Sequence, residues 1–371
     1  MTAAAPAAPP VSFRVLDRSF GQRLLAINRA CPIEADFTFR FDREPDFFAW
    51  PDRVFEYHRY VGIFAGDDLV GYCLAGLRTG WLGRAWGRYA YVGDARVLPA
   101  FRGRGLTRHA VLRLAAELRT EVDIAVFLVK QGNRAAERIV ASLSLPDAEV
   151  VSLGQFDVFN LPLLRQIEVG HLATVRLAKW EDLEEVAGLI TRWGAGRLFA
   201  PRFRADTLGE RWREAGLGPE QHLLAFRGGR VVGVLGLWDL RELRQVTLLH
   251  YAWRSGPLRA VYQIGSRLSR LVAPLPAPGG AIRSLTITDL AVADDDPAVL
   301  RLLLAAAVSQ GLGHGYHLLQ MGCCAADPLR AALRGLLAQR FSSTIFAAAT
   351  PEGSEALRSP GRAPYLDLPL V

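Results

Sequence analysis

An internal repeat constrains the fold of this 371-residue chain more than any other feature of its sequence. Residues 13–15 match residues 175–177, and residues 64–71 match residues 226–233, with the same separation in both pairs. The longer match places a tight, glycine-containing turn between two apolar runs, which is typical of a β-hairpin. The sequence therefore predicts two halves built on one plan, which agrees with the two domains that this length allows.

A third match shows where the two halves differ. Residues 94–97 correspond to residues 289–292, but they lie further apart than the earlier pairs. The second half therefore carries an insertion before this position. We assign the insertion to residues 251–280, which end in a segment rich in proline and glycine.

Both halves show the same predicted order of elements. A first strand is followed by helices, the hairpin, a long strand, a helix, a strand and another helix, and terminal strands close each half. We expect an α+β fold of two tandem domains, each with a central mixed, mostly antiparallel sheet flanked by helices. The predicted strands are 12–16, 89–98, 124–130 and 150–161 in the first half and 174–178, 316–321, 343–348 and 365–370 in the second. The predicted helices are 106–119 and 133–142 in the first half and 297–310 and 327–339 in the second.

Composition indicates a terminal tail and a compartment, and the predicted strands of the two halves set the boundary between the domains. Residues 1–10 are rich in Ala and Pro and lack a basic stretch and a long apolar core, which predicts a disordered tail and no signal peptide. We expect a first domain over residues 11–166 and a second over residues 172–371. Because no uninterrupted apolar run approaches the length of a membrane span, we expect a cytoplasmic protein without membrane association. We expect the protein to be a monomer or a homodimer.

The charge pattern argues against nucleic acid as a partner. The net charge is +7, lysine occurs only at positions 130 and 179, and the arginines are scattered along the chain without forming a basic arm. Four cysteines show no Cys-x-x-Cys spacing, so the sequence predicts reduced thiols and no metal site.

The segment 102–107, with the sequence Arg-Gly-Arg-Gly-Leu-Thr, is the most informative local feature. It lies between a predicted strand and a predicted helix, where glycines allow a tight turn and the helix start offers free N–H groups to an anion. A P-loop is excluded because no lysine lies nearby, and a dinucleotide fingerprint is excluded because a third glycine is missing. The segment therefore predicts a cradle for a phosphate-bearing ligand.

Residues 97–107 resemble the acetyl-CoA signature of the GNAT superfamily of N-acetyltransferases, usually written Val-x-Pro-x-x-Arg-Gly-x-Gly-x-Gly/Ala. One departure is Thr107, where the family prefers Gly or Ala. The resemblance implies acetyl-CoA as co-substrate, no metal, and the GNAT fold in each half. It also implies cofactor contacts at Val97, Leu98, Arg102, Gly103, Arg104, Gly105, Leu106, Thr107 and Asn133.

Catalytic groups are less well marked by the resemblance. Asp94 is the candidate general base for an incoming amine, although a purely structural role in the strand is the alternative. Asn133 precedes a predicted helix, so an N-cap role is compatible with a cofactor contact. The tyrosine that the family commonly uses to protonate the departing thiolate is replaced by Val140. Either the thiolate leaves unassisted or another residue serves as the acid.

The second half lacks the cradle. Its corresponding segment, residues 293–297, has the sequence Ala-Asp-Asp-Asp-Pro, which suits a helix start but would repel a diphosphate. We therefore expect a degenerate second domain.

The predicted function is that of an acetyl-CoA-dependent N-acetyltransferase acting on a small-molecule or protein amine. Two alternatives stay open: a non-catalytic acyl-CoA-binding or regulatory protein, and a transferase of another acyl group, such as an aminoacyl or longer-chain group. The aromatic-rich segment 37–57 would line the acceptor side, although most of its aromatic side chains are expected in the core.

Overall fold

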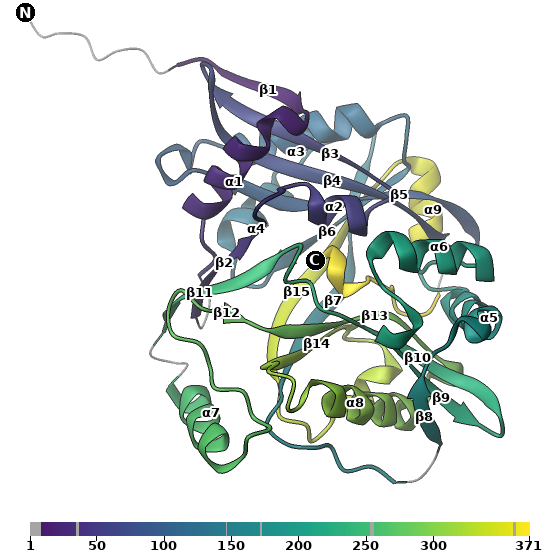
Figure 1. Ribbon diagram of the computed structural model, residues 1–371. Coiled ribbons are helices and arrows are strands. Elements are labelled where there is room, and N and C mark those ends of the chain that lie inside the picture. Colours follow the sequence, from purple (N-terminus) through teal and green to yellow (C-terminus); the bar gives the residue numbers. More distant parts are fainter. Residues whose placement is uncertain (1–8, 35–36, 146, 171–172, 253–255, 359–360) are drawn as a thin grey trace, which may run out of the picture.

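The computed structural model describes residues 9–34, 37–145, 147–170, 173–252, 256–358 and 361–371. Residues 1–8 of the predicted tail and residues 171–172 of the predicted boundary lie outside this part. The first half contains β1 (Val11–Leu16), η1 (Arg18–Phe20), α1 (Gly21–Ala30), β2 (Phe37–Asp42), α2 (Ala49–Val54), β3 (Tyr57–Ala65), β4 (Asp68–Leu82), β5 (Ala85–Val97), η2 (Pro99–Phe101), α3 (Leu106–Leu118), β6 (Ile124–Lys130), α4 (Arg134–Ala141) and β7 (Glu149–Pro162), where η marks a short 3-10 helix (Figure 1).

The second half repeats this order, with an insertion after its hairpin. It contains β8 (Thr174–Leu177), η3 (Trp180–Asp182), α5 (Leu183–Gly194), α6 (Ala205–Ala215), η4 (Pro219–Gln221), β9 (His222–Arg227), β10 (Arg230–Trp238), β11 (Gln245–Tyr251), α7 (Gly256–Leu268), β12 (Ala281–Ile282), β13 (Ser284–Val292), η6 (Ala293–Asp295), α8 (Pro297–Gly311), β14 (Leu318–Cys324), η7 (Pro328–Leu333), β15 (Gln339–Ala349), α9 (Pro351–Arg358) and η8 (Leu368–Leu370). Helix α7 lies inside the predicted insertion.

One continuous sheet of twelve strands joins the two halves, in the order β1-β3-β4-β5-β6-β15-β7-β14-β13-β10-β9-β8. The α+β class, the tandem plan and the mostly antiparallel sheet are therefore confirmed. The prediction that each half keeps its own terminal strand is wrong. Strand β15 of the second half pairs with β6 of the first, and β7 of the first half pairs with β14 of the second.

The two exchanged strands also pair with each other at the centre of the sheet. Their antiparallel register runs from Gln339–Asn160 to Ala349–Glu149. Alternating apolar residues predict a strand but do not name its partner, because every strand edge offers the same backbone groups. A smaller sheet, β12-β11-β2, adds a second connection, since β2 comes from the first half and β11 from the insertion.

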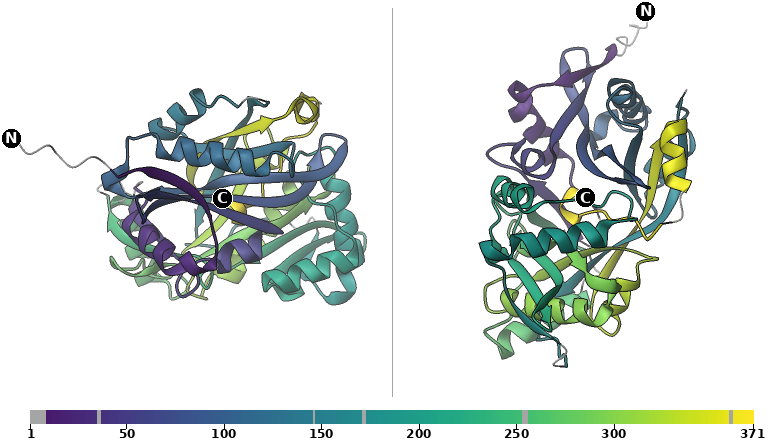
Figure 2. Two further views of the ribbon diagram at one scale, coloured as in Figure 1. Left: turned by 90° about the horizontal axis from the view of Figure 1, so that it is seen from above. Right: turned by 90° about the vertical axis from the view of Figure 1, so that its right-hand side faces the viewer.

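Helices cover the first half of the sheet on both faces. Figure 2 shows α1 and α3 on opposite sides of strands β3–β5. Nearly every residue of β4 is accordingly buried, as expected for a strand covered on both faces. Helix α3 packs on the sheet through Leu106, Ala110, Leu114 and Leu118, whose spacing of four places them on one helix face.

Two predicted elements of the second half are wrong. The predicted helix 327–339 is only the short η7, because the chain turns at Gly335, where φ is +74°, and then begins β15. The predicted strand 365–370 contains η8 and no strand. Pro364 and Pro369 lack the N–H groups that a ladder requires.

Only half of the aromatic side chains in segment 37–57 are core, fewer than expected, because Phe37, Phe39 and Phe41 are half-buried and Tyr57 is exposed. Phe47, Phe48, Trp50 and Phe55 are buried, and Phe47 and Phe48 pack edge-on to each other. Among the described helices, none has both the length and the apolar character needed to cross a bilayer.

Candidate active site

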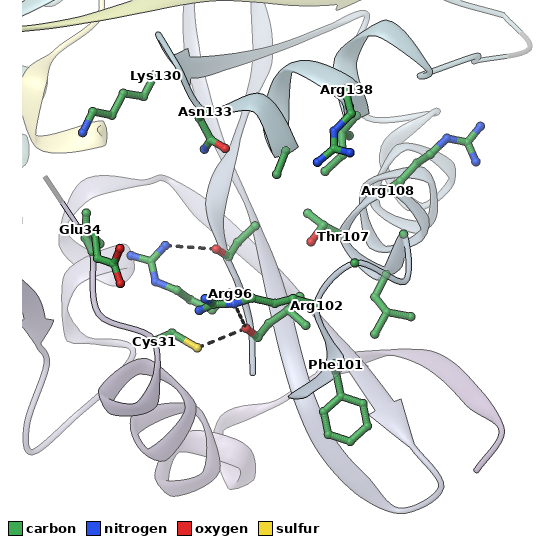
Figure 3. A pocket seen from close by; sticks show the side chains of 18 of the residues that line it. Cys31, Glu34, Arg96, Phe101, Arg102, Thr107, Arg108, Lys130, Asn133 and Arg138 are labelled. Atoms are coloured by element: carbon green, nitrogen blue, oxygen red, sulfur yellow. Dashed lines mark hydrogen bonds between the residues drawn. The ribbon is translucent and has the colours of Figure 1, made fainter. Parts of the chain in front are cut away.

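The glycine-containing segment between β5 and α3 borders a cavity of about 840 Å³. Gly103 and Gly105 have φ angles of +78° and +71°, a region that side chains other than glycine rarely adopt. The chain turns at these two glycines, so that residues 103–105 curve into the first turn of α3. The sequence-predicted cradle is therefore present as a turn with the expected geometry (Figure 3).

The start of α3 is open. Gly105 is its N-cap and no side chain caps the helix. Within the described chain, the backbone N–H groups from Gly103 to Arg108 have no hydrogen-bond acceptor. Free N–H groups and the positive end of a helix dipole together form an anion site. This set fits a diphosphate, which is the group that the sequence predicted.

Positive side chains surround the cradle. Figure 3 shows Arg102, Arg108, Arg138 and Lys130 around the cavity, with Glu34 as an acidic neighbour. Among the described residues, these four cations have no ion-pair partner; Arg102 and Arg108 instead donate to backbone carbonyls of Val97 and Ser142. Unneutralised cations beside free N–H groups favour a ligand with several negative charges.

The structure brings most of the predicted cofactor residues together. Those that line the cavity are Val97, Arg102, Gly103, Gly105, Leu106, Thr107 and Asn133. Asn133 is also the N-cap of α4, since its side chain accepts from the backbone N–H of Ala136 at 3.2 Å. Two predicted residues do not line the cavity. The N–H of Leu98 donates to Val70, and the Arg104 side chain lies over the Phe101 ring.

Several lining residues were missed from the sequence. They are Cys31, Pro32, Ile33 and Glu34 after α1, Lys130 to Gly132 at the end of β6, and Arg138 on α4. The position of Lys130, three residues before Asn133 and at the end of a predicted strand, was a usable signal. Residues 31–34 carry no such signal in the sequence, because their approach to β5 depends on the tertiary fold.

Asp94 occupies a β-bulge in β5. Asp94 and Ala95 lie opposite the single residue Cys73, and Asp94 has a φ of +46°. Asp tolerates this left-handed conformation better than most residues. Asp289, its counterpart in the repeat, occupies the same kind of bulge with a φ of +50°. The bulge therefore belongs to the shared plan of both halves.

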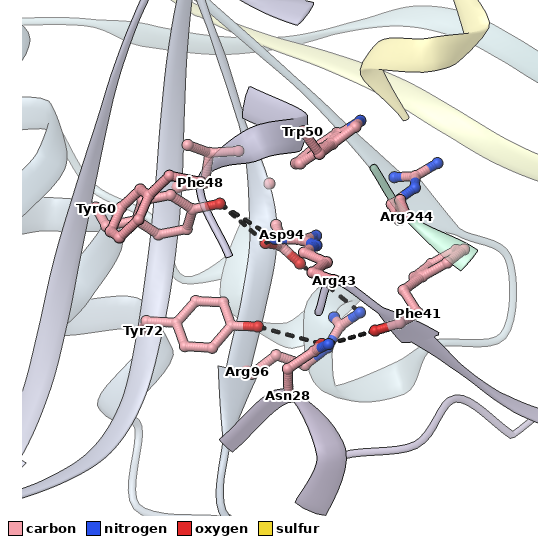
Figure 4. Close-up of polar contacts among 12 residues, drawn as sticks. Asn28, Phe41, Arg43, Phe48, Trp50, Tyr60, Tyr72, Asp94, Arg96 and Arg244 are labelled. Carbon is pink, nitrogen blue, oxygen red and sulfur yellow. Dashed lines mark hydrogen bonds and ion pairs between the residues drawn. The ribbon is translucent and has the colours of Figure 1, made fainter. Parts of the chain in front are cut away.

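The Asp94 carboxylate lies in a buried polar cluster (Figure 4). Its Oδ2 accepts from Arg43 Nη1 at 2.7 Å and from the Tyr60 hydroxyl at 3.3 Å. Its Oδ1 lies 3.8 Å from Arg96 Nη2 and accepts no hydrogen bond among the described residues. The side chain is 6% exposed, so the pair with Arg43 is shielded from water.

The environment fixes the protonation states around Asp94. Burial opposes the charge of Arg43, but the Asp94 carboxylate together with Tyr60 and Tyr72 outweighs it, so the pKa of Arg43 is raised. Burial raises the pKa of Tyr60 well above its ordinary value, so its hydroxyl remains a donor. Burial, reinforced by the charge of Arg43, lowers the pKa of Arg244 to about 10. Its guanidinium lies 4.8 Å from the ring centre of Trp50.

Strands β5 and β6 separate beside the cradle. They pair in parallel only at Ala90–Ala125 and Tyr91–Val126. Beyond Tyr91, the edge of β5 that faces β6 has no strand partner among the described residues. Side chains already bond some of its carbonyls, since that of Val97 accepts from Arg102 and Cys31, and the remaining backbone groups are open to a ligand with amide groups. A second cavity, of about 710 Å³, lies along this gap between α3 and α4.

Four side chains that could replace the family tyrosine as the acid are buried or bonded to other groups. Tyr89 is buried and bonds to Phe199, Tyr91 is buried, His58 bonds to Asp52, and His109 bonds to Gly105. Val140, at the position of the family tyrosine, lines the second cavity. Burial raises the pKa of the nearby Cys73 thiol to about 12, which leaves it protonated and a poor nucleophile near neutral pH.

The second half has closed the equivalent site. Asp296 caps α8 by accepting from the N–H of Ala298 at 2.9 Å, as its sequence suggested. The gap beside β13 and β14 is filled by the chain itself, since Cys324 donates to the carbonyl of Pro364 at 3.0 Å. Only about 20 Å³ of space remains there. In the described part of the chain, no group of three or more His, Cys, Asp or Glu could hold a metal.

Comparison with known proteins places this geometry among acyltransferases. Residues 22–142 match the acetyltransferase (GNAT) family. No curated protein matches the chain. Among solved structures, N-myristoyltransferase of Saccharomyces cerevisiae with bound myristoyl-CoA superposes with a TM-score of 0.59 at 12% identity, over 94% of this chain and 80% of that one.

Two further structures have a similar fold. A glucosamine N-acetyltransferase region of a fungal multi-domain β-N-acetylglucosaminidase has a TM-score of 0.61 at 11% identity, over 93% of this chain and 39% of that one. A GNAT-type N-acetyltransferase of Anabaena variabilis has a TM-score of 0.52 at 11% identity, over 91% of this chain and 72% of that one. At these identities the likeness concerns the fold.

Proposed function

We propose that this chain, whose residues 22–142 match the acetyltransferase (GNAT) family, transfers an acyl group from an acyl-CoA directly to an amine. The observation that carries the proposal is the open start of α3, where the N–H groups of residues 103–108 have no acceptor within the described chain. An acyl-CoA supplies both a diphosphate for these groups and an activated acyl group for transfer.

In this proposal the cradle and the strand edge share the donor. The N–H groups of residues 103–108, together with Arg102, Arg108, Arg138 and Lys130, hold the diphosphate. The unpaired edge of β5 beyond Tyr91 offers backbone groups to the amides of the pantetheine arm. This places the thioester near the bulge at Asp94, where backbone N–H groups stabilise negative charge on the carbonyl oxygen.

Direct transfer suits the side chains near the bulge. The Cys73 thiol is protonated near neutral pH, so an acyl-cysteine relay is disfavoured. Asp94 stays our candidate base, and its Oδ1 is the atom available to accept a proton from the amine. Because Val140 replaces the usual acid, the thiolate leaves without a tyrosine donor. The low pKa of a thiol makes that departure feasible.

The acyl group and the acceptor are finer questions. The names of the similar structures include both a myristoyl and an acetyl transferase, so fold likeness does not choose between acyl groups. Acetyl-CoA, which the sequence predicts, and an amine on a small molecule or a protein remain predictions. A non-catalytic acyl-CoA-binding protein is the alternative, and it predicts binding without release of free thiol.

Thr107→Glu tests the cradle. Residue 107 is in the first turn of α3, where a carboxylate is compatible with the helix dipole and folding is preserved. Its charge would instead repel the diphosphate. We expect the variant to bind CoA at least about tenfold more weakly in calorimetry, the result of losing roughly 1.4 kcal/mol.

Thr107→Gln is the matched neutral control and should keep most of the affinity. Equal CoA binding by wild type and Thr107→Glu, with equal melting temperatures, would reject the cradle as the site. Binding that is normal, without thiol release for any amine in a broad panel, would favour the non-catalytic alternative.

A further inference from the structure

The second cavity points to the identity of the acyl group. We infer that the donor carries a medium- or long-chain saturated acyl group, which lies in the cavity of about 710 Å³ between α3, α4 and the gap beside β6. This inference rests on the proposed function for the CoA part of the donor. It departs from acetyl-CoA, because the pantetheine arm would take the part of this space along the edge of β5, and an acetyl group would leave the part between α3 and α4 unfilled.

The wall of the cavity is apolar along its length. Val92 and Phe127 contribute from the strands, Val111 and Ala115 from α3, and Val140 from α4, with Leu143 following that helix. Asp123, Asp147 and Arg119 also border the cavity and are exposed, while Asp94 and Arg96 border it beside the cradle. An apolar wall with its charged groups confined to these two borders suits a hydrocarbon chain.

Helix α4 has an apolar face that the protein leaves uncovered. Ala136, Ile139, Val140 and Leu143 recur at helical spacing and border the cavity. No residue of α4 is buried, although a helix with such a face normally packs against a core. An apolar face of this kind gains stability when an apolar ligand covers it.

Helix α3 shows the same feature on one of its two apolar faces. Leu106, Ala110 and Leu114 are buried against the sheet. Val111 and Ala115, one position further round the helix, are only half-buried and line the cavity. Two helices therefore turn apolar side chains toward the same space.

The cavity is continuous with the cradle. Ala95, Arg96, Thr107, Asn133 and Ile139 border both spaces. A donor held by its diphosphate at the start of α3 would thus pass its pantetheine arm into the mouth of this cavity, with its acyl group further along the space between α3 and α4. This continuity assigns the space to the acyl chain of the donor.

The repeat provides an internal comparison. In the second half, residues 364–366 lie beside the gap between the two parallel strands and border a cavity of about 20 Å³ there. The same plan can therefore close this space with its own side chains. This space is open in the first half, beside the cradle, and it is nearly closed in the second half, which has no cradle.

Chain-length dependence of binding tests the inference. Calorimetry with CoA, acetyl-CoA, octanoyl-CoA and dodecanoyl-CoA, below their micelle-forming concentrations, separates the two parts of the donor. We expect the affinity to rise about fourfold for each buried CH₂, from about 0.8 kcal/mol per group, until the cavity is full. Affinity that is flat from CoA to dodecanoyl-CoA overturns the inference and leaves the proposed function intact. No binding of any of them overturns the proposed function.

Filling the cavity provides the second arm. Val140→Trp should remove the gain for the long chains and keep the affinity for acetyl-CoA, and Ala115→Phe tests the same space from α3 if the first variant folds poorly. Ala141→Trp is the matched control, since Ala141 is exposed on α4 and borders neither space. If both folded cavity variants keep the chain-length gain, the acyl chain binds elsewhere and the inference is wrong.

Discussion

The two carboxylate oxygens of Asp94 differ in their contacts, which bears on the structural and catalytic roles that the sequence left as alternatives. Its Oδ2 holds the buried Arg43, while its Oδ1 accepts no hydrogen bond among the described residues. The first contact is structural, and the second atom is the one available to a substrate. Asp289, the repeat counterpart, has its Oδ2 bonded to both Trp212 and His222 in the half without a cradle.

We expect Asp94→Asn to lower kcat by about 10²–10⁴-fold, because the amine loses its proton acceptor. Asn also tolerates the φ of +46°, so backbone strain is not introduced. The melting temperature should fall as well, since removing one charge of a buried pair costs up to about 3–5 kcal/mol. Thiol release with an amine panel measures the first effect, and thermal unfolding measures the second.

Asp289→Asn is the control for that experiment. It removes the matching carboxylate from the second half and should lower stability while leaving kcat of the folded protein unchanged. Equal kcat for wild type and Asp94→Asn would mean that Asp94 only anchors Arg43, and the base would have to be sought elsewhere.

At the scale of elements, the two repeat-related helices α3 and α8 differ at their first turn. Helix α3 begins after a glycine and has no side-chain cap, whereas Asp296 caps α8 and also pairs with Arg227. A carboxylate on the first N–H groups stabilises a helix by taking the place that an anionic ligand would use. In the second half a carboxylate of the chain therefore occupies the place that an anion could take at the start of α3.

Asp296→Ala should reduce the free energy of unfolding by about 1 kcal/mol, the usual effect of losing an N-cap. The exposed pair with Arg227 adds little to this figure. Urea unfolding followed by circular dichroism measures the change, and CoA binding should be unaffected. A loss of CoA affinity in this variant would show that the second half takes part in binding.

Element positions were predictable where periodicity and turn residues agreed. The predicted helix 106–119 and strand 124–130 differ from α3 and β6 by at most one residue. The failures, 327–339 and 365–370, lie where proline, a positive-φ glycine and buried polar contacts override the apolar pattern. Local pattern is a weak guide at such positions.

At the scale of the whole molecule, the exchange of β7 and β15 makes the halves depend on each other. Each predicted domain, cut at 166 and 172, would lose the central strand that its partner supplies. The exposed edges of β6 and β14 would then carry unpaired backbone groups. The boundaries at 11–166 and 172–371 remain predictions for the order of the chain, but they do not describe the pairing in the sheet.

We therefore expect fragments 11–166 and 172–371, expressed alone, to lack a stable fold and to show no cooperative unfolding transition. The intact chain should unfold in one transition. Mixing the two fragments should restore part of the structure, because the complementary strands are then both present. Circular dichroism and size-exclusion chromatography report on both. A cooperative transition in the first fragment alone would contradict the dependence.

The sequence by itself determined the tandem plan, the turn at 102–107 and the loss of that turn in the second half. These depend on repeats, on glycine conformation and on helix starts, which act over a few residues. Only the tertiary structure decided which strands pair, where residues 31–34 approach the cradle and how large the second cavity is. Ala348 and Thr350, at and just beyond the end of the exchanged strand β15, line that cavity. Their positions depend on contacts between segments far apart in the chain, which no local pattern specifies.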